Sequence, residues 1–466
     1  MNKPAAIPQF APPAFVREAR AEFDALLKAH PDLQFVDAVL ADICGTLRGK
    51  RLPIADAARI FDSGMQIPKS IYLMDARGEM ANPFGRGVSD GDPDGTAWPV
   101  PGTLARLGAA NVPRAQVLMT LRADDGLPDP AEPRAVLEHV VALFAEAKIT
   151  PVAALELEFY LLDRTRDADG LPQPPLCPRS GLRDRGISVY GIDDLDRYEA
   201  FLHGLAAAAK VQSIPLIAAS KEYAPGQFEA NLKHQTDALK AADHAIFLKQ
   251  VVKAAAQAEG FAATFMAKPY ADKPGSGLHI HLSLIDESGR NLFDDGSEEG
   301  SEQLRFAVAG LQQLMPQSMA LFAPNVNSYR RFEPDMFAPV NRRWGYNNRS
   351  TGLRIPAGPC TARRVEHRVA GADANPYLAL AAVLAGVHHG LAHKPDPGTP
   401  ATTNVSREPD GALPLTLDAA LAMLAQSAEL KSYLGEEALS LYPETKRIEA
   451  QRLRRTITAA EYQWYL

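Results

Sequence analysis

Residues 264–284, TFMAKPYADKPGSGLHIHLSL, combine a Gly-Ser-Gly turn with an alternating segment that carries His279 and His281. The segment predicts a strand, and because successive side chains of a strand point to opposite faces, residues two apart share one face. Both imidazoles therefore point the same way, where each can bind a metal, contact a phosphate or transfer a proton. Half-buried strands also carry histidines that only satisfy hydrogen bonds, so the interpretation depends on whether other stretches present matching groups.

Two other stretches supply carboxylates. Glu156 and Glu158 lie in the otherwise apolar strand AALELEFYLL (153–162) and face the same side, while Glu222 and Glu229 flank the turn YAPGQF (223–228). Buried carboxylates without a partner either destabilise the fold or take up protons, so a cation is their natural partner. The alternative is solvation, on the outer face of an edge strand for the first pair and beside the turn for the second.

A third stretch adds guanidinium groups. Arg364, Glu366 and Arg368 alternate in RVEHR (364–368) and share one strand face, which predicts either a structural salt-bridge ladder or part of a site. Further arginines stand upstream, at Arg330, Arg331, Arg342, Arg343, Arg349 and Arg354. In an acidic chain this concentration favours a polyanionic ligand, and phosphate is the simplest one, because guanidinium groups bind phosphate and carboxylate through two parallel hydrogen bonds.

Length and composition narrow the classes of protein. A chain of 466 residues with 46% hydrophobic and 23% charged residues is typical of a globular protein with two domains or one large one. The net charge of −7 argues against nucleic acid as a partner. Three scattered cysteines indicate a reducing, cytoplasmic compartment. Residues 1–15 lack the apolar core of a signal peptide, and the apolar run 377–387 is shorter than the roughly 20 residues of a membrane span.

The order of the expected elements indicates an α+β fold. We expect a helix from about residue 15, a strand over 35–43, and a long loop over the Gly-, Pro- and Asp-rich residues 74–103. Turn residues over 124–133 mark a domain boundary. Strands at 152–162 and 227–231 then alternate with helices at 195–208, 236–259 and 301–317, and another helix begins after Asn375.

The donors together point to one kind of chemistry. Several carboxylates with one imidazole favour Mg²⁺ or Mn²⁺ over zinc, which prefers thiolate and additional imidazole ligands. Divalent metals and arginines are also what phosphoryl transfer requires. The sequence contains neither a Walker A motif nor a kinase glycine-rich loop, so a nucleotide site would be of another type.

The chain resembles the glutamine synthetase family, and within it the γ-glutamylpolyamine synthetase-like branch. The resemblance is carried, in family order, by ELEFYLL, EYAPGQFEAN, KPGSGLHIHLSL, NNRSTGLRIP, RRVEHR and ANPYLALAAVLAG. It implies a β-grasp domain at 1–128 and a catalytic α/β domain at 129–466. It also implies assembly into a dodecamer of two stacked hexameric rings, with active sites between subunits.

The resemblance assigns roles residue by residue. The ligands of two or more Mg²⁺ or Mn²⁺ ions would be Glu158, Glu222 and Glu229 for one ion, and Glu156, His279 and Glu366 for another. ATP would contact His281, Ser283, Arg354 and Arg364, and Arg349 would hold the phosphoryl group in transit. Gly275, Arg331 and Arg368 would bind glutamate. Asp94, with Asp92 close behind it, would reach the site of a neighbouring subunit.

The implied reaction activates the glutamate side chain as γ-glutamyl phosphate, which an amine then attacks. Phe337 replaces the family glutamate that helps to bind and deprotonate ammonium, so we expect a primary amine with an apolar stem, with Glu333 and Asp335 near its pocket. Pro274 replaces a family asparagine, and no tyrosine lies at 402–414, where some bacterial members are adenylylated. Glutamine synthesis from ammonia and a non-catalytic structural role are the competing readings.

Overall fold

The N-terminal part of the protein is built on a six-stranded sheet. The structure is a computed structural model and describes residues 13–108, 112–122 and 126–466. The strand order is β2-β1-β6-β4-β3, with β5 beside β6, and β1 runs parallel to β6. The strands are β1 Phe35–Ala41, β2 Leu47–Pro53, β3 Met65–Pro68, β4 Asp94–Pro99, β5 Ala105–Arg106 and β6 Arg114–Arg122.

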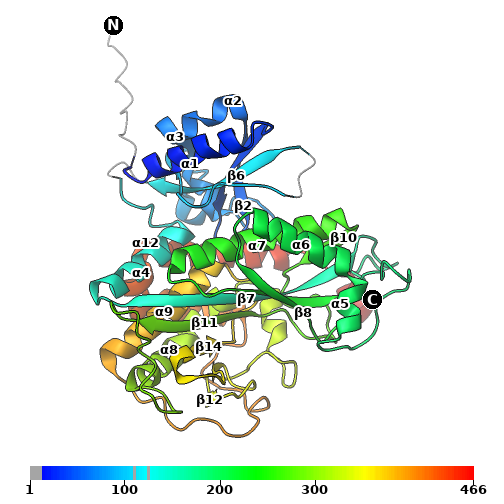
Figure 1. Cartoon of the computed structure of the whole chain (residues 1–466). Coiled ribbons are helices and arrows are strands. Elements are labelled where there is room, and N and C mark those ends of the chain that lie inside the picture. Colours follow the sequence, from blue (N-terminus) through cyan, green and yellow to red (C-terminus); the bar gives the residue numbers. More distant parts are fainter. Residues whose placement is uncertain (1–12, 109–111, 123–125) are drawn as a thin grey trace.

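Helix α1 (Val16–Ala29) covers this sheet together with α2 (Ile54–Ala57) and α3 (Arg59–Ser63), as the blue part of Figure 1 shows. The Phe23 ring of α1 stacks on Phe61 of α3 with ring centroids 4.6 Å apart. These side chains close a small core of their own with Val36, Leu40, Val117 and Leu121. A helix packed on a mixed sheet in this way agrees with the expected β-grasp fold.

The second sheet has eight strands in the order β12-β13-β14-β11-β7-β9-β8, with β10 also beside β7. Its central strands, β7 and β11, pair in antiparallel fashion along the whole length of β11. The strands are β7 Thr150–Asp163, β8 Leu216–Lys221, β9 Gln227–Leu232, β10 Phe261–Thr264, β11 Leu278–Ile285, β12 Trp344–Tyr346, β13 Leu353–Ile355 and β14 Val365–His367.

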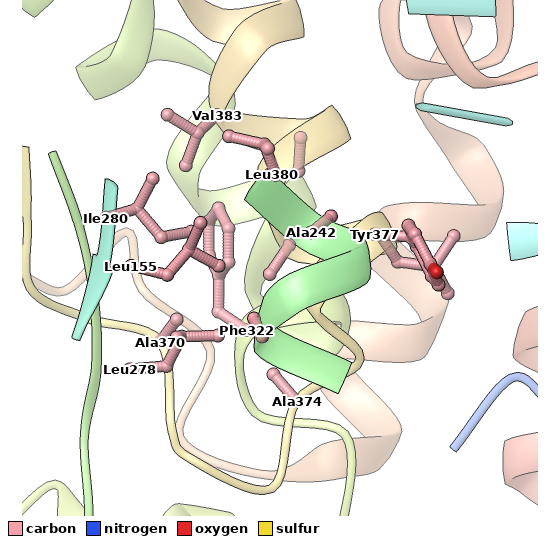
Figure 2. Close-up of a cluster of buried hydrophobic side chains, with 14 of the residues drawn as sticks. Leu155, Ala242, Leu278, Ile280, Phe322, Ala370, Ala374, Tyr377, Leu380 and Val383 are labelled. Atoms are coloured by element: carbon pink, nitrogen blue, oxygen red, sulfur yellow. The ribbon is translucent and has the colours of Figure 1, made fainter. Parts of the chain in front are cut away.

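One face of this sheet is apolar and packs against helices. Figure 2 shows Leu155 of β7 and Ile280 of β11 pointing toward Ala242, Leu380 and Val383 on the helices. These helices are α4 Pro133–Glu146, α7 Ala238–Ala258, α8 Glu302–Phe322 and α9 Pro376–His393. Along β7 the burial alternates, so Leu155, Leu157 and Phe159 are fully buried while Glu156 and Glu158 lie on the opposite face. The polar residues of the strands therefore gather on the face that these helices leave open.

The two parts of the protein are joined by buried polar contacts. Asn375 accepts hydrogen bonds from the backbone N–H groups of Tyr377 and Leu378, as expected of a helix cap, and its own Nδ2 donates to the Asp42 carbonyl at 2.9 Å. The remaining elements are α5 Ile192–Arg197, α6 Glu199–Val211, α10 Leu417–Gln426, α11 Ala428–Leu434, α12 Glu436–Arg454 and α13 Ala459–Tyr465, and the short 3₁₀ helices Lys69–Leu73, Pro83–Gly85, Val326–Arg331 and Cys360–Ala362.

Most expected elements are present, and three expectations need correction. The single helix expected at 195–208 is divided at Tyr198 into α5 and α6. The predicted loop at 74–103 contains strand β4, because Asp94–Pro99 pairs with both β3 and β6 despite its flanking prolines and glycines. The helix expected to end at residue 317 continues through Pro316 to Phe322. Residues 1–12 and 123–125, which include part of the proposed boundary, lie outside the described residues. Within the described part of the chain, no helix has the length and apolarity needed to cross a membrane.

Candidate active site

The register of the second sheet brings the predicted site residues onto one face. Glu156 lies opposite His279 in the β7–β11 pairing, and Glu158 lies opposite Glu229 in the β7–β9 pairing. On the other side of β11, Glu366 of β14 lies opposite His281 and opposite Arg354 of β13. Directly opposed residues of neighbouring strands share a face with about 5 Å between their Cβ atoms, so these side chains converge.

Two groups of atoms that could hold a metal ion form at this convergence, and His279 belongs to both. One group is Glu156, His279 and Glu366, and the other is Glu158, Glu229 and His279. His279 Nδ1 lies 3.5 Å from Glu156 Oε2 and 3.9 Å from Glu366 Oε1, while His279 Nε2 lies 3.9 Å from Glu158 Oε1. Glu222 is outside these close groups but lines the same cavity.

The carboxylates of this cluster differ in whether their surroundings favour the charged form. Burial, together with nearby Glu158 and Glu229, raises the pKa of Glu222 to about 8. Burial and the neighbouring Glu156 also raise the pKa of Glu229. For Glu156 the adjacent imidazoles of His279 and His281 outweigh burial, and its pKa is lowered. Oxygen donors held together at this separation fit Mg²⁺ or Mn²⁺, because a divalent cation would offset the burial and the mutual repulsion that raise the pKa values of Glu222 and Glu229.

Glu366 is the most buried acid of the cluster, with an exposed fraction of 1%. Its carboxylate accepts hydrogen bonds from Arg354 Nη1 at 2.7 Å and from Arg368 Nη1. Of the two arginines in the possible salt-bridge ladder, only Arg368 contacts Glu366, because Arg364 donates from Nε to His281 Nδ1 at 3.2 Å. The strand register decides this, because Arg354 stands directly opposite Glu366.

The cluster opens into a cavity of about 700 Å³, here called the central cavity. Gly275, Arg331, Arg349 and Arg368 line it together with the acids and histidines. A side chain at position 275 would collide with the Arg331 stem and the Ala267 carbonyl, so only glycine fits there. Arg331 is buried, and its Nη1 donates to the Val369 carbonyl at 3.1 Å, which fixes a guanidinium group at the cavity wall.

A second cavity of about 620 Å³, here called the side cavity, adjoins the first and shares Glu156, His281 and Arg364 with it. Ser283 lines the side cavity, as do apolar residues such as Val152 and Ile217 and polar ones such as Asn231 and Asn291. A flat aromatic ligand would find apolar walls here, with its anionic end beside Arg364 and the metal-ligating group. The four residues expected to contact ATP therefore divide between two cavities: Ser283 lines the side cavity, Arg354 the central one, and His281 and Arg364 line both.

Three aromatic side chains line the central cavity, and none of them lines the side cavity. Phe337 is 64% exposed, and its ring lies 5.2 Å from that of Tyr223. Tyr190 and Tyr223 line the central cavity with it, and neither was singled out from the sequence. Tyr223 adjoins Glu222 in the recognised motif and so could have been found, whereas the stretch around Tyr190 carries no motif.

The charged residues near Phe337 differ in their surroundings. Asp335 accepts hydrogen bonds from Arg407 Nε at 2.7 Å and from Ser406 Oγ at 3.0 Å. Glu333 lies 3.9 Å from the Lys268 ammonium and lines neither the central nor the side cavity. The two acids expected near the amine therefore have different partners, which are Arg407 and Ser406 for Asp335 and Lys268 for Glu333.

Other predicted residues lie elsewhere. Arg342 and Arg343 pair with Asp410 and Glu408, so they are salt-bridge residues and do not line the central cavity. Asp94 begins β4 in the N-terminal sheet and is exposed, and neither it nor Asp92 lines the central cavity of this chain. A role for Asp94 in a neighbouring subunit stays a prediction.

Comparison with known proteins finds enzymes that are similar to this chain in sequence and fold. The family described as "Glutamine synthetase, catalytic domain" matches residues 130–465. The chain is 41% identical to γ-glutamylputrescine synthetase of Escherichia coli K12, over 97% of this chain and 95% of that protein. It is 31% identical to a glutamate–isopropylamine ligase of a Pseudomonas species, over 91% and 93% respectively. A solved structure titled "Apo GmaS without ligand" superposes with a TM-score of 0.81 at 27% identity, covering 95% of this chain and 98% of that one.

Proposed function

The chain belongs to the glutamine synthetase family and is a carbon–nitrogen ligase, and we propose that its reaction joins the γ-carboxylate of glutamate to a primary amine with an apolar stem, driven by ATP. The observation that carries the amine is the aromatic part of the central cavity, where Phe337 and Tyr223 lie against each other. The similarity to a γ-glutamylputrescine synthetase and to an isopropylamine ligase supports the same class of substrate.

The two groups of ligating atoms are the proposed metal sites. Glu156, His279 and Glu366 would hold one ion, and Glu158 and Glu229 of the other group, joined by Glu222 from the same cavity, would hold a second one beside it. Bound Mg²⁺ or Mn²⁺ would neutralise phosphate charge and orient the phosphoryl group. The rigid strands fix the spacing of these carboxylates, so the protein holds the donors in place before a ligand arrives.

The adjoining cavities suggest where the substrates bind. ATP would place its base in the side cavity, beside Ser283, and its phosphates toward His281, Arg354 and Arg364. Glutamate would lie in the central cavity, where Arg331 and Arg368 offer guanidinium groups to its carboxylate and Gly275 leaves room for it. Arg349 lines the same cavity and would neutralise the charge that develops as the phosphoryl group moves to the γ-carboxylate.

The second step needs a neutral amine. The aromatic wall of Tyr190, Tyr223 and Phe337 would bury the methylenes of the amine at about 0.8 kcal/mol each. It offers ammonium nothing comparable, since that ion is small and strongly hydrated. A base must remove the proton of the attacking nitrogen, and we assign that role to Asp94 of a neighbouring subunit, in a dodecamer of two hexameric rings.

The function is tested by measuring ADP release that depends on both glutamate and amine, over a panel from ammonium to butylamine, ethanolamine, 1,4-diaminobutane and spermidine. We expect alkylamines to give a higher kcat/KM than ammonium, with a γ-glutamylamide as product. A preference for ammonium over every amine would assign the protein to glutamine synthesis instead. Absence of ADP release with every nitrogen donor would leave the non-catalytic reading.

A further inference from the structure

The short 3₁₀ helix Val326–Arg331 carries Arg331 to the wall of the central cavity, and its first residues belong to a chain of polar contacts. Asn325, which precedes the helix, donates from its backbone N–H to Ser328 Oγ at 2.9 Å. Both residues also donate to one oxygen of Asp373, Asn325 from Nδ2 at 2.7 Å and Ser328 from Oγ at 2.6 Å. The beginning of the helix is therefore fixed to the segment that contains Asp373.

Asp373 also lies beside the guanidinium group of Arg331. A Cβ atom at Gly371 would meet Asp373 Oδ1 at 2.5 Å and Arg331 Nη1 at 3.1 Å, so both atoms face the same small volume. Burial lowers the pKa of Arg331, and the negative charge of Asp373 opposes that shift. Asp373 Oδ1 is buried and has no hydrogen-bond partner within the described part of the chain, so this oxygen acts on the guanidinium group through its charge.

The other end of the chain is the buried Lys446 of α12. Its Nζ donates to Asn325 Oδ1 at 2.8 Å and to Glu449 Oε1 at 2.6 Å. Glu449 in turn accepts a hydrogen bond at 2.9 Å from the backbone N–H of Ala76, in the N-terminal part of the protein. The Asn325 amide has its oxygen toward a cation and its nitrogen toward the Asp373 carboxylate, which permits only one orientation of the amide.

We infer that Lys446, Asn325 and Asp373 are positioning residues for Arg331, and that they set the affinity of the central cavity for glutamate. The inference rests on the proposed function, in which Arg331 binds a carboxylate of glutamate. A guanidinium group binds a carboxylate best through two parallel N–H donors, so a small rotation of Arg331 weakens that contact. None of the three positioning residues lines the side cavity, so their loss should change the binding of glutamate and leave the binding of ATP unaffected.

The test compares two substitutions to methionine in α12. Lys446→Met removes the ammonium group that binds Asn325. Arg452→Met is the matched control, because Arg452 joins α12 to the same N-terminal turn through Asp75 Oδ2 at 2.8 Å and the Met80 carbonyl at 2.9 Å. We expect Lys446→Met to raise the KM for glutamate about tenfold, as for the loss of one hydrogen bond to a charged group, with kcat and the KM for ATP unchanged. Arg452→Met should leave all three constants unchanged.

Asp373→Asn provides the same test if Lys446→Met does not fold, because it preserves the shape of the side chain and removes its charge. It should likewise raise the KM for glutamate and not the KM for ATP. In a protein that carries Arg331→Lys, neither substitution should raise the KM for glutamate further, since both act through the guanidinium group of Arg331.

A purely structural role predicts different results. Lys446→Met and Arg452→Met would then have equal effects on the KM for glutamate, or the effects of Asp373→Asn and Arg331→Lys would be fully additive. Either result overturns the inference and leaves the ligase function intact. Failure of the proposed function itself is distinguishable, because the wild-type enzyme would then release no glutamate-dependent ADP with any amine.

Discussion

Replacing Glu366 with glutamine tests the metal assignment and the electrostatics of the site together. The carboxylate is 1% exposed and lies between Arg354 and Arg368. Burial acts to raise the pKa of Glu366, but Arg368, the neighbouring histidines and Arg354 outweigh it and lower the pKa from 4.5 to about 2. At 1.36 kcal/mol per pKa unit this difference corresponds to ~3 kcal/mol, within the range of about 3–5 kcal/mol for removing one partner of a buried ion pair.

We therefore expect Glu366→Gln to lose about 3 kcal/mol of unfolding free energy and, in addition, essentially all ATP turnover. The matched control is Asp243→Asn. Asp243 is a buried carboxylate that binds Arg134 Nε at 2.9 Å and the Tyr377 hydroxyl at 2.7 Å, and it lines neither the central nor the side cavity. This variant should lose comparable stability but keep its activity below its unfolding temperature.

The assay combines urea unfolding, followed by circular dichroism, with ADP release at saturating glutamate and amine. Turnover is measured at a temperature at which both variants are folded, so a decrease in turnover cannot result from unfolding. If Glu366→Gln is destabilised like Asp243→Asn and yet retains near-native turnover, Glu366 is a structural ion-pair residue and the metal assignment fails.

Four further outcomes are expected. Phe337→Glu should shift the kcat/KM ratio toward ammonium by about tenfold, since it removes the contact of one or two methylenes at ~0.8 kcal/mol each and adds a carboxylate; an unchanged ratio would contradict the amine pocket. His279→Ala should raise the metal concentration needed for half-maximal activity, whereas His281→Ala should mainly raise the apparent KM for ATP, and equal effects of both variants on both titrations would refute that division. Incubation with an adenylyltransferase should leave the intact mass unchanged, because no tyrosine lies at 402–414. Burial raises the pKa of Glu132 to about 7, so the contribution of this group to stability is complete below pH 4.5 and is lost as the pH rises through about 7. Measured by urea unfolding, Glu132→Gln should therefore become more stable relative to wild type by about 3 kcal/mol between pH 4.5 and pH 8. A stability difference that does not change with pH would contradict this.

Local alternation was enough to predict which residues share a face. Glu156 and Glu158 lie on one side of β7, and His279 and His281 on the same side of β11, because a spacing of two fixes direction within any strand. The helix cap at Asn375 was also predictable from the residues next to it in the sequence. By contrast, the contact between Glu366 and Arg354 depends on the register of β13 against β14, which no spacing within either segment encodes. Proximity in sequence favoured Arg364 as the partner of Glu366, but the strand pairing places Arg354 beside it.

The proposed metal and amine residues differ in the kind of backbone that carries them. Metal-ligating groups come mainly from strands, at positions fixed by cross-strand pairing. Tyr190, Asp335 and Phe337 instead lie in loops with left-handed φ angles of 56°, 63° and 65°. Such angles are uncommon outside glycine and gather at functional sites. Substitutions in loops do not alter the strand register. They can therefore change which amine is preferred while the geometry of the proposed metal site is kept. With this separation, a chain can differ from the expected ammonia-using pattern at Phe337 and still keep every acid of the proposed metal sites.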